Sequence, residues 1–473
     1  MRRYRYPILL ATALILGGIL PAGGQDKFKE GLAPGGDPAK FKTDREFAAG
    51  LRSGWQKAEL SPGLIPDETP KPDRPPVAPR PSAPPDWRRG RTVTVPPPAV
   101  RSPAPSVAPP EIASPASFTF FEAPVTLDRG GQAEIPLPAP VTQSAIAAWW
   151  EAQSALPYSP LLAQAQDYRH RLNLNDWGYA RLLYDLGRTL HRGNPNSAAL
   201  FAGFMLVKSG FDARVGYNLD RIFLLLPCQP AVYHAPFYTL GDRRYYLATF
   251  SGGPEPAGSL FIFPDRYPGA DRSLDLRVPR APTLESACLE RAFRFTHQGR
   301  EYDLAVRCNR PAVAYFLAYP QTGLEVYFGA PFTPETAASL RERFAPLLQG
   351  KTEAEAVSLL LSFVQSLPYA TDRQRLGRED YSFPEAALEA PAGDCEDRAA
   401  LFAALVRELT GLEVIGLDYP GHVAAAVRFS DDLPGDTVTW QGRRYLVCDP
   451  TYLDAQIGQG QPQYRGMEPK VIG

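Results

Sequence analysis

The residue with the clearest chemical potential is Cys395, which stands in the segment AGDCEDRAALFAALVREL. Further along the chain, His422 follows in YPGHVAAAV and Asp449 in LVCDPTY. A cysteine nucleophile needs a base to take its proton, a group to orient that base, and donors for the oxyanion. Cys395 would be the nucleophile, and His422 and Asp449 match the first two of these parts. The sequence therefore predicts a cysteine-dependent acyl-transfer site.

The elements around these residues would position them. The Ala/Leu-rich run after Cys395 predicts a helix, with Asp394 as its N-cap and Asp397 as the capping-box partner. Cys395 would then open the helix, where free backbone N–H groups and the helix dipole stabilise a thiolate. His422 would begin a strand, and Asp449 would close the next hairpin, where it can fix the imidazole tautomer.

Acidic neighbours should discourage ionisation of the Cys395 thiol, so their expected positions matter. If Asp394 and Asp397 cap the helix, their charges are directed at backbone N–H groups, and Glu396 can face water. Protonated His422 and the helix terminus would then favour the thiolate. For the oxyanion, we expect one donor from the backbone N–H of Cys395 and a second from Tyr381.

The segments GDCEDRAALFAALVREL, YPGHVAAAV and CDPTY together resemble the transglutaminase-like superfamily, in particular its bacterial cysteine-protease-like members. The resemblance covers roughly residues 331–452. It implies Cys395 as nucleophile, His422 as base and Asp449 as orienting acid, on a papain-like core of a helix followed by an antiparallel sheet. Glu396 stands where the eukaryotic crosslinking enzymes carry tryptophan, which argues against protein crosslinking.

Two parts of the chain resemble each other. Residues 198–217 align with residues 399–418 without a gap, and both segments begin AALFA. Downstream, DRRYYLAT matches GRRYLVCD, and upstream APVT matches APFT, in the same order. Matches over this distance indicate two tandem copies of one domain. The first copy carries Asn194, Arg221 and Thr249 at the positions of the triad, so we expect it to be chemically silent.

The overall prediction is an α+β fold. It consists of a signal peptide (1–24), a Pro-rich and largely disordered linker (25–116), a degenerate transglutaminase-like domain (117–255), a β-rich segment (256–328) and the catalytic domain (329–473). The linker is predicted because many of the 51 prolines lie between Ser61 and Ala116, where they favour an extended chain.

The first residues predict export. Arg2, Arg3 and Arg5 precede an apolar run that ends at Leu20, and small residues at 22–24 offer a cleavage site. The run is shorter than the roughly 20 residues of a membrane span. We therefore expect a periplasmic or secreted protein without a stable membrane span after cleavage; the alternative is anchoring by an uncleaved N-terminal segment.

Composition limits the partners. The net charge is −1, which gives no indication of nucleic-acid binding. We expect a protein or peptide substrate, no cofactor and no metal, and the oligomeric state is not predicted. A zinc site built from Cys395, His422, Cys448 and Asp449 is the weaker alternative, since no CxxC or HxxxH spacing supports it.

The other cysteines are interpreted as structural. Cys228 and Cys448 are expected in the core. Cys288 and Cys308 flank a predicted hairpin whose register, with Phe295 opposite Tyr302, sets Leu289 opposite Cys308 and turns Cys288 to the other face. We therefore predict no disulfide between Cys288 and Cys308.

Two functions are consistent with these patterns. The first is an exported cysteine hydrolase or acyltransferase that acts on a peptide or amide bond through a thioester, with hydrolysis favoured over transamidation. The second is a non-enzymatic transglutaminase-like scaffold or binding protein of the cell envelope. The intact Cys395, His422 and Asp449 set favours the enzyme.

Overall fold

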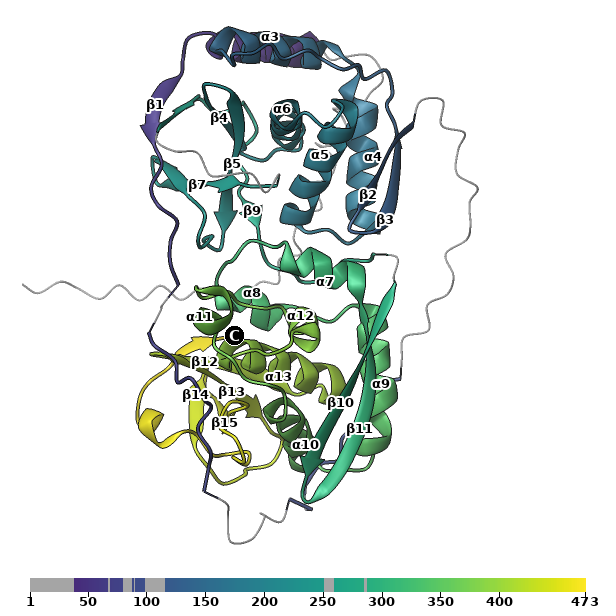
Figure 1. Ribbon diagram of the computed structural model, residues 1–473, viewed down its shortest axis with the longest axis vertical. Coiled ribbons are helices and arrows are strands. Elements are labelled where there is room, and N and C mark those ends of the chain that lie inside the picture. The colour runs from purple at the N-terminus through teal and green to yellow at the C-terminus, as the bar shows by residue number, and fades with distance from the viewer. Residues whose placement is uncertain are drawn as a thin grey trace, which may run out of the picture.

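The computed structural model describes residues 38–66, 69–79, 87–88, 90–97, 115–250, 259–284 and 287–473. The chain forms two lobes stacked along the long axis of the molecule (Figure 1). Of the described residues, the N-terminal lobe contains 38–60, 115–250 and 259–284, and the C-terminal lobe contains 69–79, 87–88, 90–97 and 287–473. One hydrophobic cluster runs through both lobes. The predicted α+β class is confirmed.

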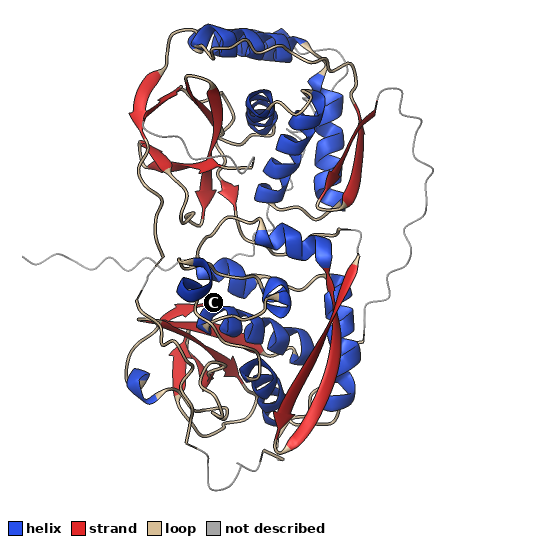
Figure 2. Ribbon diagram, viewed as in Figure 1, coloured by secondary structure: helices blue, strands red, loops and turns tan. Residues whose placement is uncertain are grey.

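The N-terminal lobe consists of helices on one side of an antiparallel sheet (Figure 2). Its helices are α2 (Pro38–Gly50), α3 (Gln143–Ala155), α4 (Tyr158–Arg171), α5 (Asp176–Leu190) and α6 (Pro195–Lys208). A hairpin, β2 (Pro115–Phe120) and β3 (Ala123–Asp128), precedes α3. The sheet contains β1 (Gln56–Glu59), β4 (Arg214–Asn218), β5 (Arg221–Gln229), β6 (Phe237–Leu240), β7 (Arg243–Ala248) and β8 (Ser259–Ile262), and the short β9 (Leu274–Asp275) pairs with β5.

The C-terminal lobe has a similar plan. It starts with a long hairpin, β10 (Cys288–His297) and β11 (Arg300–Asn309). Helices follow: α7 (Arg310–Leu317), α8 (Leu324–Gly329), α9 (Pro334–Leu348), α10 (Glu353–Gln365), α11 (Asp372–Leu376), α12 (Pro384–Glu389) and α13 (Cys395–Thr410). The sheet contains β12 (Glu413–Tyr419), β13 (His422–Arg428), β14 (Thr437–Trp440), β15 (Arg443–Cys448) and β16 (Lys470–Ile472).

Helix α13 is the central element of the C-terminal lobe. It is buried along almost its whole length, packed between α8, α9, α10 and α12 on one side and β12 and β13 on the other. Its Ala/Leu composition suits this position, because small and straight-chain residues favour a helix and allow close packing. It ends where Gly411 adopts a left-handed conformation (φ 72°).

The two sheets share one strand order. The order β8-β4-β5-β7-β6 in the N-terminal lobe corresponds to β16-β12-β13-β15-β14 in the C-terminal lobe. The hairpin registers also correspond, because Asn218 pairs with Arg221 as Tyr419 pairs with His422. In each lobe a buried helix, α6 or α13, directly precedes a sheet strand, β4 or β12, and a two-stranded hairpin precedes the helices α3 to α6 or α7 to α13 (Figure 2).

Two predictions about domain boundaries are wrong. Helix α2 and strand β1, which pairs with β8, lie in the segment predicted to be a disordered linker. Residues 69–79 of the same segment lie against the C-terminal lobe, where Ala78 N–H donates to Leu453 O at 2.7 Å. The β-rich segment is not a separate unit either: β8 joins the N-terminal sheet, whereas β10 and β11 pack on α10 and α9. Local composition did not reveal these long-range pairings.

The long hairpin has the predicted register. Phe295 lies opposite Tyr302, Leu289 lies opposite Cys308, and no disulfide joins Cys288 and Cys308. This prediction is confirmed. The predicted signal peptide lies outside the described residues, and within those residues no helix is long and apolar enough to cross a membrane.

Glu385 of α12 links three elements that surround α13. Its Oε1 accepts from Asn309 N–H at 3.0 Å and from the Thr336 hydroxyl at 2.6 Å, and its Oε2 accepts from Thr333 N–H at 2.7 Å. The side chain is buried. The end of β11 and the start of α9 are therefore held to α12 by one carboxylate.

We expect Glu385→Gln to lower the free energy of unfolding by about 2–3 kcal/mol, because the new amide N–H₂ group faces a donor and leaves it unsatisfied. Urea unfolding followed by tryptophan fluorescence measures this. The control is Glu342→Gln, whose half-exposed pair with Arg307 should matter by less than about 0.5 kcal/mol. Equal effects of the two substitutions would contradict this role of Glu385.

Candidate functional site

His422 and Asp449 form a buried pair at one end of the C-terminal sheet. His422 is the first residue of β13, and Asp449 directly follows β15, the adjacent antiparallel strand. The start of one strand and the end of the other therefore lie together. His422 Nε2 lies 2.8 Å from Asp449 Oδ2. This is the orientation expected of an imidazole held by a carboxylate, and it leaves Nδ1 for another partner.

Further donors keep Asp449 ionised. Thr451 N–H donates to its Oδ1 at 2.9 Å, and the Gln461 amide donates to its Oδ2 at 3.0 Å. Burial raises the pKa of Asp449, but the His422 charge and these hydrogen bonds outweigh burial and lower the pKa below its ordinary value. The ring of Tyr464 stacks on His422 at 5.1 Å between centroids. Sequence patterns did not identify Gln461 or Tyr464.

Cys395 is the first residue of α13 and is only 1% exposed. Its Sγ donates to Glu396 Oε2 at 3.1 Å, and among the described residues no hydrogen bond joins Sγ to His422. Burial and the charge of Glu396 raise the pKa of the thiol well above its ordinary value. The charge of Lys71 opposes this shift. In this state the thiol is therefore protonated.

Tyr464 lies near both Cys395 and the His422 and Asp449 pair. Burial raises the pKa of Tyr464, and the charges of Cys395 and Asp449 raise it further. Tyr464 is also the residue that stacks on His422. The structure thus brings the three residues of the predicted triad into one region, without a direct hydrogen bond from the thiol to the imidazole.

The expected role of the acids next to Cys395 is wrong. Asp394 occupies the N-cap position, but its side chain makes no capping hydrogen bond. Asp397 Oδ1 accepts from Ser382 N–H at 2.8 Å instead of reaching back to the N-cap. Glu396 is buried and contacts the thiol instead of facing water. The local sequence suggested a surface helix terminus, whereas residues 371–383 and Lys71 cover it.

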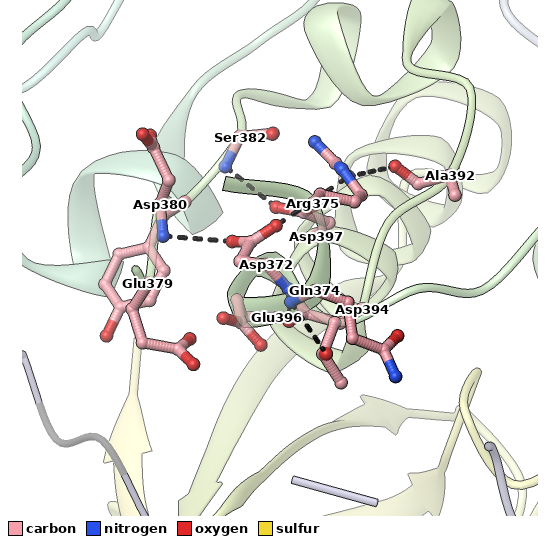
Figure 3. A network of polar contacts seen from close by, with 12 residues as sticks. Asp372, Gln374, Arg375, Glu379, Asp380, Ser382, Ala392, Asp394, Glu396 and Asp397 are labelled. Atoms are coloured by element: carbon pink, nitrogen blue, oxygen red, sulfur yellow. Dashed lines mark hydrogen bonds and ion pairs between the residues drawn. The ribbon is translucent and has the colours of Figure 1, made fainter. Parts of the chain in front are cut away.

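These acids belong to a larger buried group. Carboxylate oxygens of Asp372, Glu379, Asp394 and Glu396 all lie within 4.8 Å of one another, and we call these four residues the acid cluster. Figure 3 shows them pointing toward one another from α11, α13 and the segment between α11 and α12. Backbone donors hold the geometry: Asp380 N–H donates to Asp372 at 2.9 Å, and Asp372 N–H donates to Asp394 at 3.2 Å.

Burial and mutual repulsion weaken the acidity of this region. Desolvation and the charges of Asp397 and Asp394 raise the pKa of Asp372 to about 8. Desolvation and the charge of Asp394 raise the pKa of Asp397 to about 7. The same causes raise the pKa of Glu396 well above its ordinary value. The acid cluster is therefore a place where a positive charge is strongly favoured.

Lys71 provides that charge. Its Nζ donates to Glu379 and Glu396 and lies 3.0 Å from Asp394 Oδ2, and its side chain is 7% exposed. Burial alone would lower the pKa of Lys71, but the charges of Glu396, Cys395 and Asp394 outweigh burial and raise it, so the amine is an ammonium. Lys71 comes from a Pro-rich segment with no pattern that marks it as functional.

The remaining predicted residues lie in or near this region. Burial raises the pKa of Tyr381, followed by the charge of Glu396, and the charge of Lys71 lowers it, so its phenol is in range of both. Cys448 Sγ is buried and faces Leu446 O at 3.6 Å. In the N-terminal lobe, Asn194 caps α6 by accepting from Ser197 N–H at 3.1 Å, and Arg221 and Thr249 line one small cavity.

A cavity of about 180 Å³ opens beside the His422 and Asp449 pair. It is polar at one end, where Asp436 and Arg465 form an ion pair, and aromatic at Tyr419 and Tyr464. Both His422 and Gln461 line this cavity. The cavity gives the imidazole a route to solvent that does not pass through the acid cluster.

Comparison with known proteins gives no relative: no family model, no curated protein and no solved structure matches this chain.

We expect Glu396→Gln to increase the rate of Cys395 alkylation by iodoacetamide at pH 7.5 by about fivefold or more. The substitution removes the nearest negative charge and therefore lowers the pKa of the thiol. Peptide mapping of the alkylated chain gives the rate. Glu379→Gln is the matched control, because Glu379 contacts Lys71 but not Cys395. An equal increase in both variants would mean that Glu396 does not act on the thiol.

Asp397→Asn should change how stability depends on pH. Since the folded-state pKa of Asp397 is raised to about 7, the folded chain retains a proton that the unfolded chain loses near pH 4. The free energy of unfolding of the unsubstituted protein therefore falls from about pH 4 to pH 7. The variant keeps the acceptor for Ser382 N–H and lacks this titration. Between pH 5 and pH 8, urea unfolding should show the free energy of unfolding of Asp397→Asn rise relative to that of the unsubstituted protein by about 1 kcal/mol or more. If the difference between the two proteins is the same at both pH values, this prediction is wrong.

Proposed function

We propose that this protein is a cysteine hydrolase that cleaves a peptide or amide bond through a thioester on Cys395. One observation carries the proposal: a cysteine opens a buried helix, and the adjacent sheet ends in a buried His422 and Asp449 pair at 2.8 Å. A nucleophile at a helix terminus with a carboxylate-oriented imidazole in the same region is the arrangement that thiol acylation requires.

The chemistry assigns one role to each residue. His422 Nδ1 takes the thiol proton, because Nε2 is held by Asp449. The Cys395 sulfur then forms a bond to the carbonyl carbon, and the amide C–N bond breaks as the imidazolium returns its proton to the leaving amine. Water, deprotonated by His422, attacks the thioester; the C–S bond breaks and the sulfur regains a proton. The Cys395 N–H and the Tyr381 hydroxyl are proposed as oxyanion donors.

Hydrolysis is favoured over transamidation by the state of the amine nearest to the nucleophile. A thioester can transfer to an amine only if that amine has a free lone pair. The raised pKa of Lys71 makes it an ammonium, and the acid cluster would protonate any other amine at the same place. Incubation with a dansyl-amine and a glutamine-rich protein tests this preference, since efficient incorporation would reverse it.

We also propose that both lobes derive from one transglutaminase-like, papain-like domain by duplication. The supporting observations are the matching strand orders, the equivalent pairs Asn218 with Arg221 and Tyr419 with His422, and a preceding hairpin in each lobe. On this proposal the N-terminal lobe is chemically silent, because Arg221 and Thr249 replace the imidazole and the carboxylate. The basic and apolar N-terminus supports the further proposal that the enzyme acts in the periplasm or outside the cell.

A scaffold function is the second candidate. The observation that favours it is the 1% exposure of Cys395, together with the raised pKa of its thiol. A buried, protonated thiol is inert in this state. For Cys395 to react, residues 371–383 and Lys71, which cover it, must move away. The enzyme proposal therefore requires this opening, whereas the scaffold function does not.

Acylation by p-nitrophenyl acetate tests the enzyme proposal. We expect an acetyl thioester at Cys395, located by peptide mapping, and a loss of about 100-fold or more in its rate of formation in His422→Ala. Asp449→Asn should give a smaller loss, since the imidazole remains but loses its orientation. Opening of the cover is the same step in each protein, so the ratio of rates reports on the imidazole.

Cys448→Ala is the control, because this buried thiol should not react. Cys395→Ala should lose the acetyl thioester that depends on His422; the exposed Cys288 is mapped separately. If His422→Ala acylates as fast as the parent protein, the thiol and the imidazole do not work together. The scaffold function would then be the better interpretation.

A further inference from the structure

Residues 69–79, TPKPDRPPVAP, cross the site in an extended conformation, and we call them the strap. Leu453 N–H donates to Pro76 O at 2.9 Å, and Ala78 N–H donates to Leu453 O at 2.7 Å. Nearer the start of the strap, the Tyr369 hydroxyl donates to Pro72 O at 3.0 Å. The strap is thus bound by backbone hydrogen bonds on the loop that follows Asp449, as an extended peptide ligand would be.

The strap also passes next to the imidazole residue. Gly421 directly precedes His422, and a Cβ atom at Gly421 would lie 2.9 Å from Thr69 Cγ2 and 3.1 Å from Pro70 O. Strap backbone therefore fills the space beside the start of β13. The strap contacts both sides of the candidate site, at Gly421 and at Leu453.

The Lys71 side chain enters the acid cluster from the strap. Asp73 and Arg74 are exposed, whereas the Lys71 side chain is buried against three carboxylates. Glu396 connects Lys71 to Cys395: one of its carboxylate oxygens accepts a hydrogen bond from the Lys71 ammonium, and the other accepts from the Cys395 thiol. An ammonium in the acid cluster is therefore separated from the Cys395 sulfur only by the carboxylate of Glu396.

The acid cluster has more acceptors than Lys71 satisfies. Asp394 is fully buried, and its Oδ1 has no hydrogen-bond partner. Oδ1 of Asp372, the fourth member of the cluster, also accepts no hydrogen bond, although Arg375 forms an ion pair with it at 3.7 Å. A buried carboxylate without a donor is costly, so the cluster is suited to a cation with several N–H donors.

We propose that the acid cluster is a recognition site for the primary ammonium of a lysine-like side chain in an extended peptide, and that the strap with Lys71 is its intramolecular occupant. The substrate would bind as the strap does, with its backbone on Leu453 and its ammonium among Glu379, Asp394 and Glu396. Occupation by the strap keeps Cys395 covered. The assignment of this peptide as a substrate rests on the proposed hydrolase function, whereas the binding itself does not.

The prolines make the strap suitable as a resident occupant. Residues 70, 72, 75, 76 and 79 are proline, so the strap is extended before it binds and loses little conformational freedom. Since it is part of the same chain, its effective concentration at the site is on the order of millimolar or higher. A separate peptide must displace it, unless Lys71 is removed.

Binding of a fluorescein-labelled peptide with the strap sequence TPKPDRPPVAP to the full chain tests this proposal. We expect Lys71→Met to bind the peptide roughly tenfold or more tightly than the unsubstituted protein, because its own strap has lost the ammonium. A peptide with norleucine in place of lysine should bind Lys71→Met roughly tenfold more weakly than the lysine peptide. Arg74→Met, which removes an exposed charge from the same strap, should behave like the unsubstituted protein.

A second variant releases the strap without changing the acid cluster. Tyr369→Phe with Gln374→Ala removes the hydrogen bonds to Pro72 O and to Asp73 Oδ1. Peptide binding should increase in this double variant as well, so the proposal remains testable if Lys71→Met does not fold. Equal binding by Lys71→Met and the unsubstituted protein, or equal binding of the lysine and norleucine peptides, would overturn the proposal.

Two further outcomes separate this proposal from others. If millimolar Ca²⁺ or Mg²⁺ stabilises Lys71→Met against urea and the lysine peptide does not bind, the acid cluster is a metal site and the proposal is wrong.

All binding measurements are repeated with Cys395→Ala, which lacks the proposed nucleophile. Peptide binding in that variant supports the recognition site even if acylation fails, and acylation without peptide binding contradicts the recognition site alone.

Discussion

The ion contact between Lys71 and the buried carboxylates at the start of α13 is the interaction on which the rest of this site depends. Glu379, Asp394 and Glu396 surround the ammonium in a region from which water is largely excluded. Breaking a buried ion pair by removing one partner costs about 3–5 kcal/mol, because the other charge is left uncompensated. The strap, the terminus of α13 and the segment between α11 and α12 are thus held together by one lysine.

This arrangement imposes opposite requirements on Cys395. The helix terminus and a nearby imidazole favour a thiolate, whereas burial and the contact with Glu396 favour the protonated thiol. With the strap bound, burial and the contact with Glu396 prevail, and the thiol is protonated. On the proposed hydrolase function, the thiol would ionise only after the strap has left, so the cysteine would not react before a substrate binds. The His422 and Asp449 pair is assembled independently, since strand geometry and Gln461 hold it.

Parts of the structure followed from local patterns. The hairpin register from Leu289 to Cys308 followed from pairing apolar with apolar and acidic with basic residues across two strands. Helix α13 followed from its Ala/Leu-rich composition. The interpretation of Glu396 as solvent-facing failed, because periodicity predicts the face of a helix but not what covers that face. Lys71 was missed because it lies about 300 positions from the residues it contacts, within a Pro-rich stretch typical of linkers.

The sequence by itself determined the α+β class, the helix that begins at Cys395, the strand that begins at His422 and the hairpin that ends before Asp449. These are local properties, set by side-chain periodicity, turn residues and capping positions. Only the tertiary structure decided the protonation state of the Cys395 thiol. Four carboxylates from two helices and the connection between α11 and α12 meet one lysine from residues 69–79, and their mutual distances, not their positions in the chain, set the charge that surrounds the sulfur.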